Sequence, residues 1–106
     1  MSYRYMRIVL LFDLPSVTNS DKRVYRKFHR YLETEGFIMM QESVYTKLSL
    51  NGSTTKAIIQ RVRNNAPKKG LIEVLAITEK QYTQIEFIAG KHHTSQIDSE
   101  ERLIVI

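Results

Sequence analysis

The chain has 106 residues, with 16 Lys or Arg against 11 Asp or Glu, so its formal net charge at pH 7 is +5. This length fits one domain with one two-layer core. The absence of cysteine excludes a disulfide framework, a thiolate zinc site and a cysteine nucleophile. The longest apolar run, residues 8–12, is far shorter than the ~20 residues of a membrane span. We therefore expect a cytoplasmic protein without membrane contact, whose basic charge indicates an anionic partner such as nucleic acid.

Apolar periodicity and turn residues predict the elements of the first 80 residues. The first strand is an apolar run that Pro15 ends. Thr18 and Asp21 make a variant of the capping box at the start of the first helix, and Gly36 is its expected stop. In chain order we expect a strand at residues 6–14, a helix from about 18–20 to 36, strands at 37–40 and 43–48, a helix at 53–65 and a strand at 71–78. This order predicts an α+β fold, the ferredoxin-like βαββαβ sandwich, with both helices on one face of an antiparallel sheet.

The chain then divides into a ferredoxin-like core, residues 1–80, and a C-terminal extension, residues 81–106. Within the extension, residues 85–89 are expected to form a further strand. The last four residues, Leu103, Ile104, Val105 and Ile106, are strongly β-prone. Such a segment needs a sheet edge, which its own chain, a dimer partner or another protein can supply, and we predict that it is a partner interface.

The first strand has apolar side chains on both of its faces. Ile8 and Leu10 alternate with Val9 and Leu11, so both faces of the sheet are expected to be covered. Since the helices cover only one face, a second copy of the chain is the simplest cover for the other. The sequence therefore predicts a homodimer.

Asp13 is the acid best placed to carry chemistry, because it ends the predicted central strand at the rim of the sheet. A lone acid in this position is also typical of a residue that starts a turn. One carboxylate cannot hold Mg²⁺ alone, and Asp21 is the nearest other acid in the sequence. If the first strand lies near a two-fold axis, Asp13 and its copy form a pair that could share one Mg²⁺ or Mn²⁺ ion. Catalysis at Asp13 would thus require a dimer.

The first predicted helix carries a stripe of basic residues opposite its apolar face. Its members are Lys22, Arg23, Arg26, Lys27 and Arg30. The i,i+4 pairs within it are like-charged, at a cost of about 0.2–0.5 kcal/mol each, and they lie toward the positive end of the helix dipole. Binding of nucleic-acid phosphates explains this arrangement better than a merely solvated face does.

A second group of cations lies in residues 43–72, which contain no acid. Its members on the second predicted helix and the turn after it are Lys56, Arg61, Arg63, Lys68 and Lys69. These residues extend the same positive field or are ordinary solvated side chains; the sequence leaves both open. The three histidines, His29, His92 and His93, have no assigned role.

Three segments resemble the CRISPR-associated protein two family, the small subunit of the spacer-acquisition complex. They are residues 8–15 (IVLLFDLP), 22–28 (KRVYRKF) and 41–45 (QESVY), and the similarity runs from about Met6 to Thr78. The charge pattern and the extended C-terminus look most like the type II-A members. Two positions depart from the family pattern: Phe12 stands where a tyrosine is usual, and Thr46 where an acid is frequent.

The resemblance implies a ferredoxin-like homodimer that bridges two dimers of the integrase, CRISPR-associated protein one, while double-stranded DNA lies across the bridge. It also implies a metal-dependent endonuclease activity on RNA or DNA in some members, with Asp13 at the position of the metal ligand. The departures at Phe12 and Thr46 weaken the nuclease interpretation and leave the DNA-bridging adaptor intact. A third alternative is a ferredoxin-like ligand-binding or toxin-like nuclease module that forms no complex with an integrase.

Overall fold

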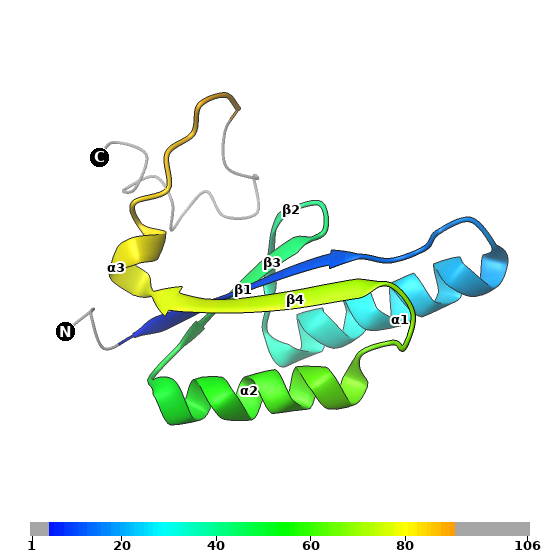
Figure 1. Ribbon diagram of the computed structural model, residues 1–106, viewed down its shortest axis with the longest axis horizontal. Helices are drawn as coiled ribbons and strands as arrows, with labels where there is room; N and C mark the ends of the chain where they lie inside the picture. Colours follow the sequence, from blue (N-terminus) through cyan, green and yellow to red (C-terminus); the bar gives the residue numbers. More distant parts are fainter. Residues whose placement is uncertain (1–4, 91–106) are drawn as a thin grey trace.

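The computed structural model describes residues 5–90, which form one four-stranded antiparallel sheet and three helices (Figure 1). The elements are β1 (Met6–Asp13), α1 (Asn19–Glu35), β2 (Ile38–Gln41), β3 (Val44–Ser49), α2 (Gly52–Asn65), β4 (Leu71–Thr78) and α3 (Glu79–Tyr82). The strand order is β2-β3-β1-β4, and α1 and α2 lie on the same side of the sheet. The α+β, ferredoxin-like arrangement predicted from the sequence is confirmed. No helix within residues 5–90 is both long and apolar enough to span a membrane.

Local sequence signals set the ends of α1. Thr18 is its N-cap: the Thr18 hydroxyl accepts from the Asp21 amide at 3.0 Å, and the Asp21 carboxylate accepts from the Thr18 amide at 3.1 Å. These two bonds form the predicted capping box and lower the pKa of Asp21. At the other end, Gly36 has φ 103°, the left-handed conformation that ends many helices. A Cβ at this position would lie 2.7 Å from Lys47 Nζ, so glycine also leaves room for that side chain.

The expected strand at residues 85–89 is wrong: these residues lie outside every strand of the described part. The reason is a second capping box, which the sequence analysis missed. The Thr78 hydroxyl accepts from the Gln81 amide, and the Gln81 side chain accepts from the Thr78 amide, so α3 begins directly after β4. This helix turns the chain away from the sheet, and Ile88, at 92% exposure, pairs with no strand of residues 5–90.

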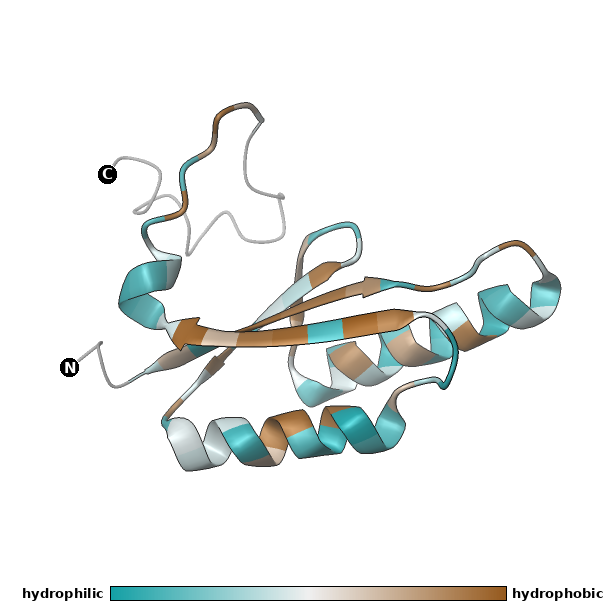
Figure 2. Cartoon of the chain, in the orientation of Figure 1, coloured by the Kyte–Doolittle hydropathy of each residue, from teal (hydrophilic) through white to brown (hydrophobic). Residues whose placement is uncertain are grey.

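The core lies between the sheet and the two long helices. The register pairs Leu10 with Tyr45 on β3 and with Val74 on β4, so these three side chains project from the same face. On that face, Phe28 and Leu32 of α1 and Ile58 and Val62 of α2 join the buried cluster. Figure 2 shows brown segments alternating with teal ones along both long helices, as an amphipathic helix requires. The predicted amphipathic helices are confirmed.

The opposite face of the sheet has no helix of residues 5–90 packed over its centre, and apolar side chains lie on it beside the acids Asp13 and Glu73. Val9 and Leu11 lie there, opposite Leu75 and beside Leu48 in the register. Leu75 is 55% exposed and Leu48 is 45% exposed. We name this surface the open face, and the apolar character predicted for it from the first strand is confirmed.

A bidentate ion pair fixes α2 against the end of α1. Arg61 Nη2 lies 2.6 Å from Glu35 Oε2, and the Tyr31 hydroxyl donates to Glu35 Oε1 at 3.0 Å. Lys47 Nζ donates to the Glu35 carbonyl oxygen and so ties β3 to the same place. The hydrogen bonds from Arg61 are the main cause of a lowered pKa of Glu35. The Glu35 carboxylate therefore contributes to stability only while it is ionised.

We expect replacement Glu35→Gln to lower the stability of the protein at neutral pH and to change its acid sensitivity. A carboxyl whose pKa is lowered on folding stabilises above its unfolded value, about 4.5, and this contribution is lost as the pH falls through the lowered folded value. Chemical unfolding from pH 7 downward should therefore show a smaller loss of stability below pH 4.5 in the variant. The matched control is Glu86→Gln, at an exposed acid in the C-terminal extension. If Glu35→Gln lost as much stability below pH 4.5 as the wild-type protein, the stabilising role of ionised Glu35 would be contradicted.

Candidate nucleic-acid interface and acidic site

The five predicted DNA-binding residues share the outer surface of α1, and all five side chains are exposed. We name this set the α1 basic surface: Lys22, Arg23, Arg26, Lys27 and Arg30. Burial of Phe28 and Leu32 against the sheet determines which side of α1 faces outward. Within residues 5–90 the ion pairs are made by Arg7, His29 and Arg61, and none involves the α1 basic surface. Its positive field is therefore not neutralised by acids of the described part.

Asp13 is the last residue of β1 and projects from the open face, opposite Leu71 of β4. Its side chain is exposed, and none of the hydrogen bonds found within residues 5–90 involves its carboxylate. The Phe12 amide donates to the Ser43 carbonyl at 3.1 Å, and Ser43 itself has φ 67°. This contact holds the turn between β2 and β3 next to the end of β1.

A hollow of about 430 Å³ joins Asp13 to the α1 basic surface. It is lined by Asp13, Leu14, Ser16, Lys22, Tyr25, Arg26, Glu42 and Ser43. Three elements thus contribute: the end of β1, the first half of α1 and the turn between β2 and β3. Lys22 and Arg26 supply positive charge beside the two carboxylates. The structure therefore brings the predicted acid and part of the predicted basic stripe to one place.

The donors in the described part of one chain do not fit a divalent metal site. Among residues 5–90, no group of three or more His, Asp or Glu side chains is close enough to hold an ion. Asp13 and Glu42 line the same hollow, but Mg²⁺ needs further oxygen ligands in near-octahedral geometry. A metal at Asp13 would have to draw further ligands from outside residues 5–90, such as a second copy, substrate phosphates or water.

The two positions that depart from the family pattern have structural roles here. Phe12 is 6% exposed, and its ring contacts the rings of Tyr25, Phe28 and Tyr45 at centroid distances of 5.6–5.7 Å. Thr46 is 1% exposed within the sheet. Neither side chain presents a polar group to the hollow beside Asp13, so both belong to the packing of the fold.

His29, which the sequence left without a role, connects α1 to β3. Its Nδ1 shares a hydrogen bond with the Tyr45 hydroxyl, and its Nε2 lies 3.3 Å from Glu33 Oε2. Burial raises the pKa of Tyr45 to about 12, so the phenol remains protonated at neutral pH. His29 thus ties the buried Tyr45 of β3 to the surface of α1. His92 and His93 lie outside the described residues, as do the predicted interface residues Leu103, Ile104, Val105 and Ile106.

Two features of the molecule escaped the sequence analysis because their partners are distant in the chain. Arg7 forms a bidentate pair with Glu79, with distances of 2.9 and 2.7 Å, and its guanidinium lies 4.3 Å from the Tyr82 ring centroid. This contact holds α3 against β1. The second feature is the closeness of Lys68 and Lys69 to Lys27 around one recess. The sequence shows Lys68 and Lys69 after Pro67, but it does not show that they lie near Lys27 of α1.

Comparisons with known proteins agree with these observations. The family model described as CRISPR associated protein Cas2 matches residues 6–85. A protein of Streptococcus mutans named CRISPR-associated endoribonuclease Cas2 is 46% identical over 95% of this chain and 93% of its own length. Proteins with the same name from Treponema denticola and Ligilactobacillus salivarius are 44% and 39% identical, each over 95% of this chain and 100% of its own length. The similarity predicted from three short segments is thus confirmed over the core of the fold, and the chain belongs to the CRISPR-associated protein Cas2 family.

Proposed function

We propose that this chain acts as a homodimeric, DNA-bridging adaptor that holds the backbone of a prespacer duplex and links two dimers of a CRISPR integrase. The observation that carries this proposal is the α1 basic surface: five exposed cations on one helix, without an ion pair to any acid of residues 5–90. Like charges at i,i+4 positions destabilise a helix, and this cost is offset when an anionic partner binds. Duplex phosphates provide that partner without any reading of base sequence.

The open face supports the homodimeric part of the proposal. Its leucines are about half exposed in the single chain, which is unfavourable for a face of this extent in water. A second copy would cover the same face and bring Asp13 of each chain toward the two-fold axis, because Asp13 lies on that face. The apolar segment Leu103–Ile106 would extend this interface or contact the integrase.

We expect Leu75→Asp to convert the protein from dimer to monomer, because the buried interface cannot accept an unpaired charge. Sedimentation velocity over a range of concentrations measures this directly. The matched control is Leu50→Asp, at a similarly exposed leucine in the turn between β3 and α2, outside the strands of the sheet. A Leu75→Asp protein that stays dimeric at every concentration would contradict this interface. Removal of residues 103–106 is expected to weaken the same association or integrase binding.

The double variant Arg23→Ala with Arg26→Ala should weaken duplex binding to a similar extent for every sequence. Each lost phosphate contact lowers the slope of log K against log salt by about 0.9, so the slope should fall by about 2. A fluorescence anisotropy titration at several salt concentrations provides the measurement. The control is Lys56→Ala with Lys80→Ala, which removes the same charge from exposed positions on α2 and α3. An unchanged slope in the α1 variant would refute the role of these residues.

A second candidate function is cleavage of RNA or DNA by a metal-dependent nuclease. The observation that favours it is the name endoribonuclease carried by the relatives, together with the exposed Asp13 beside two cations. In this alternative the paired Asp13 carboxylates of a dimer would share one Mg²⁺ or Mn²⁺ ion. The donor set within residues 5–90 of one chain is too small for that ion, so the alternative needs ligands from a second copy, from substrate phosphates or from water.

Asp13→Ala discriminates between the two functions. The adaptor proposal expects spacer acquisition in cells to remain near the wild-type level, because Asp13 does not contact the duplex. The nuclease alternative expects both acquisition and metal-dependent cleavage of RNA or DNA to be lost. The matched control is Glu73→Ala, at another exposed acid of the sheet. Loss of acquisition in a dimeric Asp13→Ala protein that still binds duplex DNA would favour the nuclease.

A further inference from the structure

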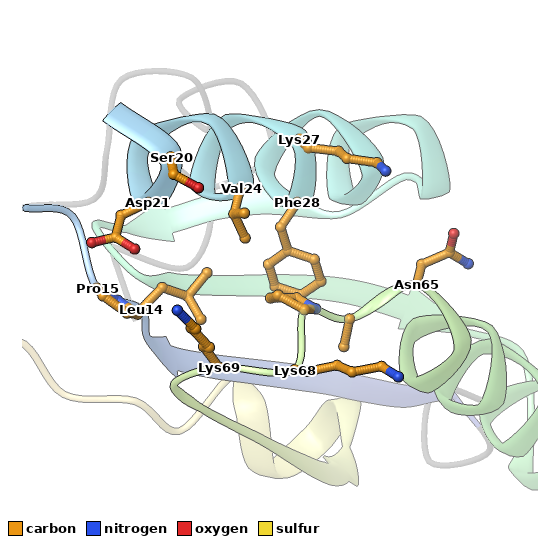
Figure 3. A pocket seen from close by; sticks show the side chains of 12 residues that line it. Leu14, Pro15, Ser20, Asp21, Val24, Lys27, Phe28, Asn65, Lys68 and Lys69 are labelled. Atoms are coloured by element: carbon orange, nitrogen blue, oxygen red, sulfur yellow. The ribbon is translucent and has the colours of Figure 1, made fainter. Parts of the chain in front are cut away.

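A second recess, distinct from the hollow at Asp13, lies between α1 and the turn that joins α2 to β4 (Figure 3). It encloses about 360 Å³, a volume within the usual range of small-ligand sites. Leu14, Val24 and Phe28 line its inner part, and Lys27, Lys68 and Lys69 contribute from its two sides. The recess thus has an apolar interior beside three cations.

The charge of this recess is strongly one-sided. Asp21 is the only acid that lines it, and its carboxylate already accepts the capping hydrogen bond from the Thr18 amide. Lys69 is near enough to Asp21 to contribute to the lowered pKa of that carboxyl, although the capping bond is the larger cause. Lys27 and Lys68 have no ion pair with an acid within residues 5–90. An anionic group at this edge would therefore meet positive charge from two separate elements.

The interior of the recess is unsuited to a phosphate alone. More of its exposed surface is apolar than polar, whereas the hollow at Asp13 has slightly more polar surface. Val24 is 42% exposed although it is an aliphatic residue on a helix next to cations. A stacked duplex keeps its bases inside and offers only phosphates and sugars, so it leaves such an apolar surface uncovered. An unpaired base has an apolar face that can cover it.

The turn that carries the two lysines is held in place by the end of β1. Gly70 has φ 87°, and a Cβ on it would lie 2.7 Å from both the Asp13 carbonyl oxygen and Leu14 Cδ2. This turn therefore packs directly on β1, and only glycine allows the approach. Pro15 and Pro67 further restrict the two segments on either side. The recess is consequently formed before any ligand arrives, which lowers the entropic cost of binding.

We propose that this recess binds an unpaired nucleotide of a DNA whose duplex part lies on the α1 basic surface. The base would pack against Val24 and Leu14, and the flanking phosphates would contact Lys27, Lys68 and Lys69. The inference rests on the proposed DNA-binding function, and Lys27 belongs to both surfaces. An acidic peptide with an apolar side chain is the alternative occupant. The five cations of the adjoining helix surface favour a polyanion that is long enough to cover both.

The test compares three fluorescent DNAs by anisotropy: a blunt duplex, the same duplex with a short thymidine tail, and the same duplex with an abasic tail of equal length. The full-length protein should bind the thymidine-tailed duplex about fivefold to tenfold more tightly than the other two. Val24→Gln, a neutral change that fills the recess, should remove this advantage and leave blunt-duplex affinity unchanged. The matched control is Val17→Gln, at an 86% exposed valine that does not line the recess. Lys68→Ala with Lys69→Ala should also reduce the advantage.

Three results would overturn the inference. Equal affinity for tailed and blunt duplexes would show that the recess does not bind an unpaired nucleotide, and that its ligand is an acidic peptide or that it has none. Equal affinity for thymidine and abasic tails would show contact with phosphates only. A Val24→Gln protein that keeps the full preference for the thymidine tail would show that the unpaired base binds elsewhere. Failure of the proposed function is distinguishable, because it removes blunt-duplex binding. In that case the recess is still tested by the binding of single-stranded thymidine DNA, which Val24→Gln should weaken.

Discussion

The pairing of β1 along both of its edges is the constraint on which the rest of the structure depends. Every residue from Met6 to Leu11 has a partner on β3 and on β4, so the strand cannot shift without breaking two ladders. This register sends Ile8, Leu10 and Phe12 toward the helices. It equally sends Val9, Leu11 and Asp13 to the open face. The position of the candidate acid is therefore a consequence of core packing, and an exchange of faces would bury a carboxylate.

Packing on the other side of β1 has a comparable consequence for the cations. Phe28 and Leu32 face the sheet. The residues on the opposite side of α1, which include the α1 basic surface, therefore face outward. Helix stability would favour acids in the first turns of α1, yet Asp21 is the single acid there and it serves the capping box. The α1 basic surface carries positive charge that no ion pair within residues 5–90 compensates. Selection for an anionic partner accounts for this pattern, whereas selection for folding stability does not.

The sequence was informative where neighbours in the chain decide the structure. The capping box at Thr18, the stop at Gly36 and the apolar run of β1 are local signals, and the structure confirms the elements that they predicted. It was uninformative where distant residues meet. Glu79 faces Arg7 across 72 positions, and this contact, with the second capping box at Thr78, produces α3 where a strand was expected. The sequence singled out Asp13 but not the hollow beside it, which Glu42 enters because the Phe12 amide bonds to the Ser43 carbonyl.

The two depressions beside α1 differ in what they can hold, and this difference follows from β1. Asp13 and Leu14 are adjacent, yet the strand directs the first to the open face and the second toward the helices. On one side a carboxylate lies near Lys22 and Arg26, without enough further acids or histidines in the described residues to hold a metal ion. On the other side Leu14 supports an apolar recess whose lysines are held by the turn at Gly70. In our proposals, the described residues hold a polyanion and its unpaired base, while cleavage of that polyanion would require metal ligands from outside residues 5–90.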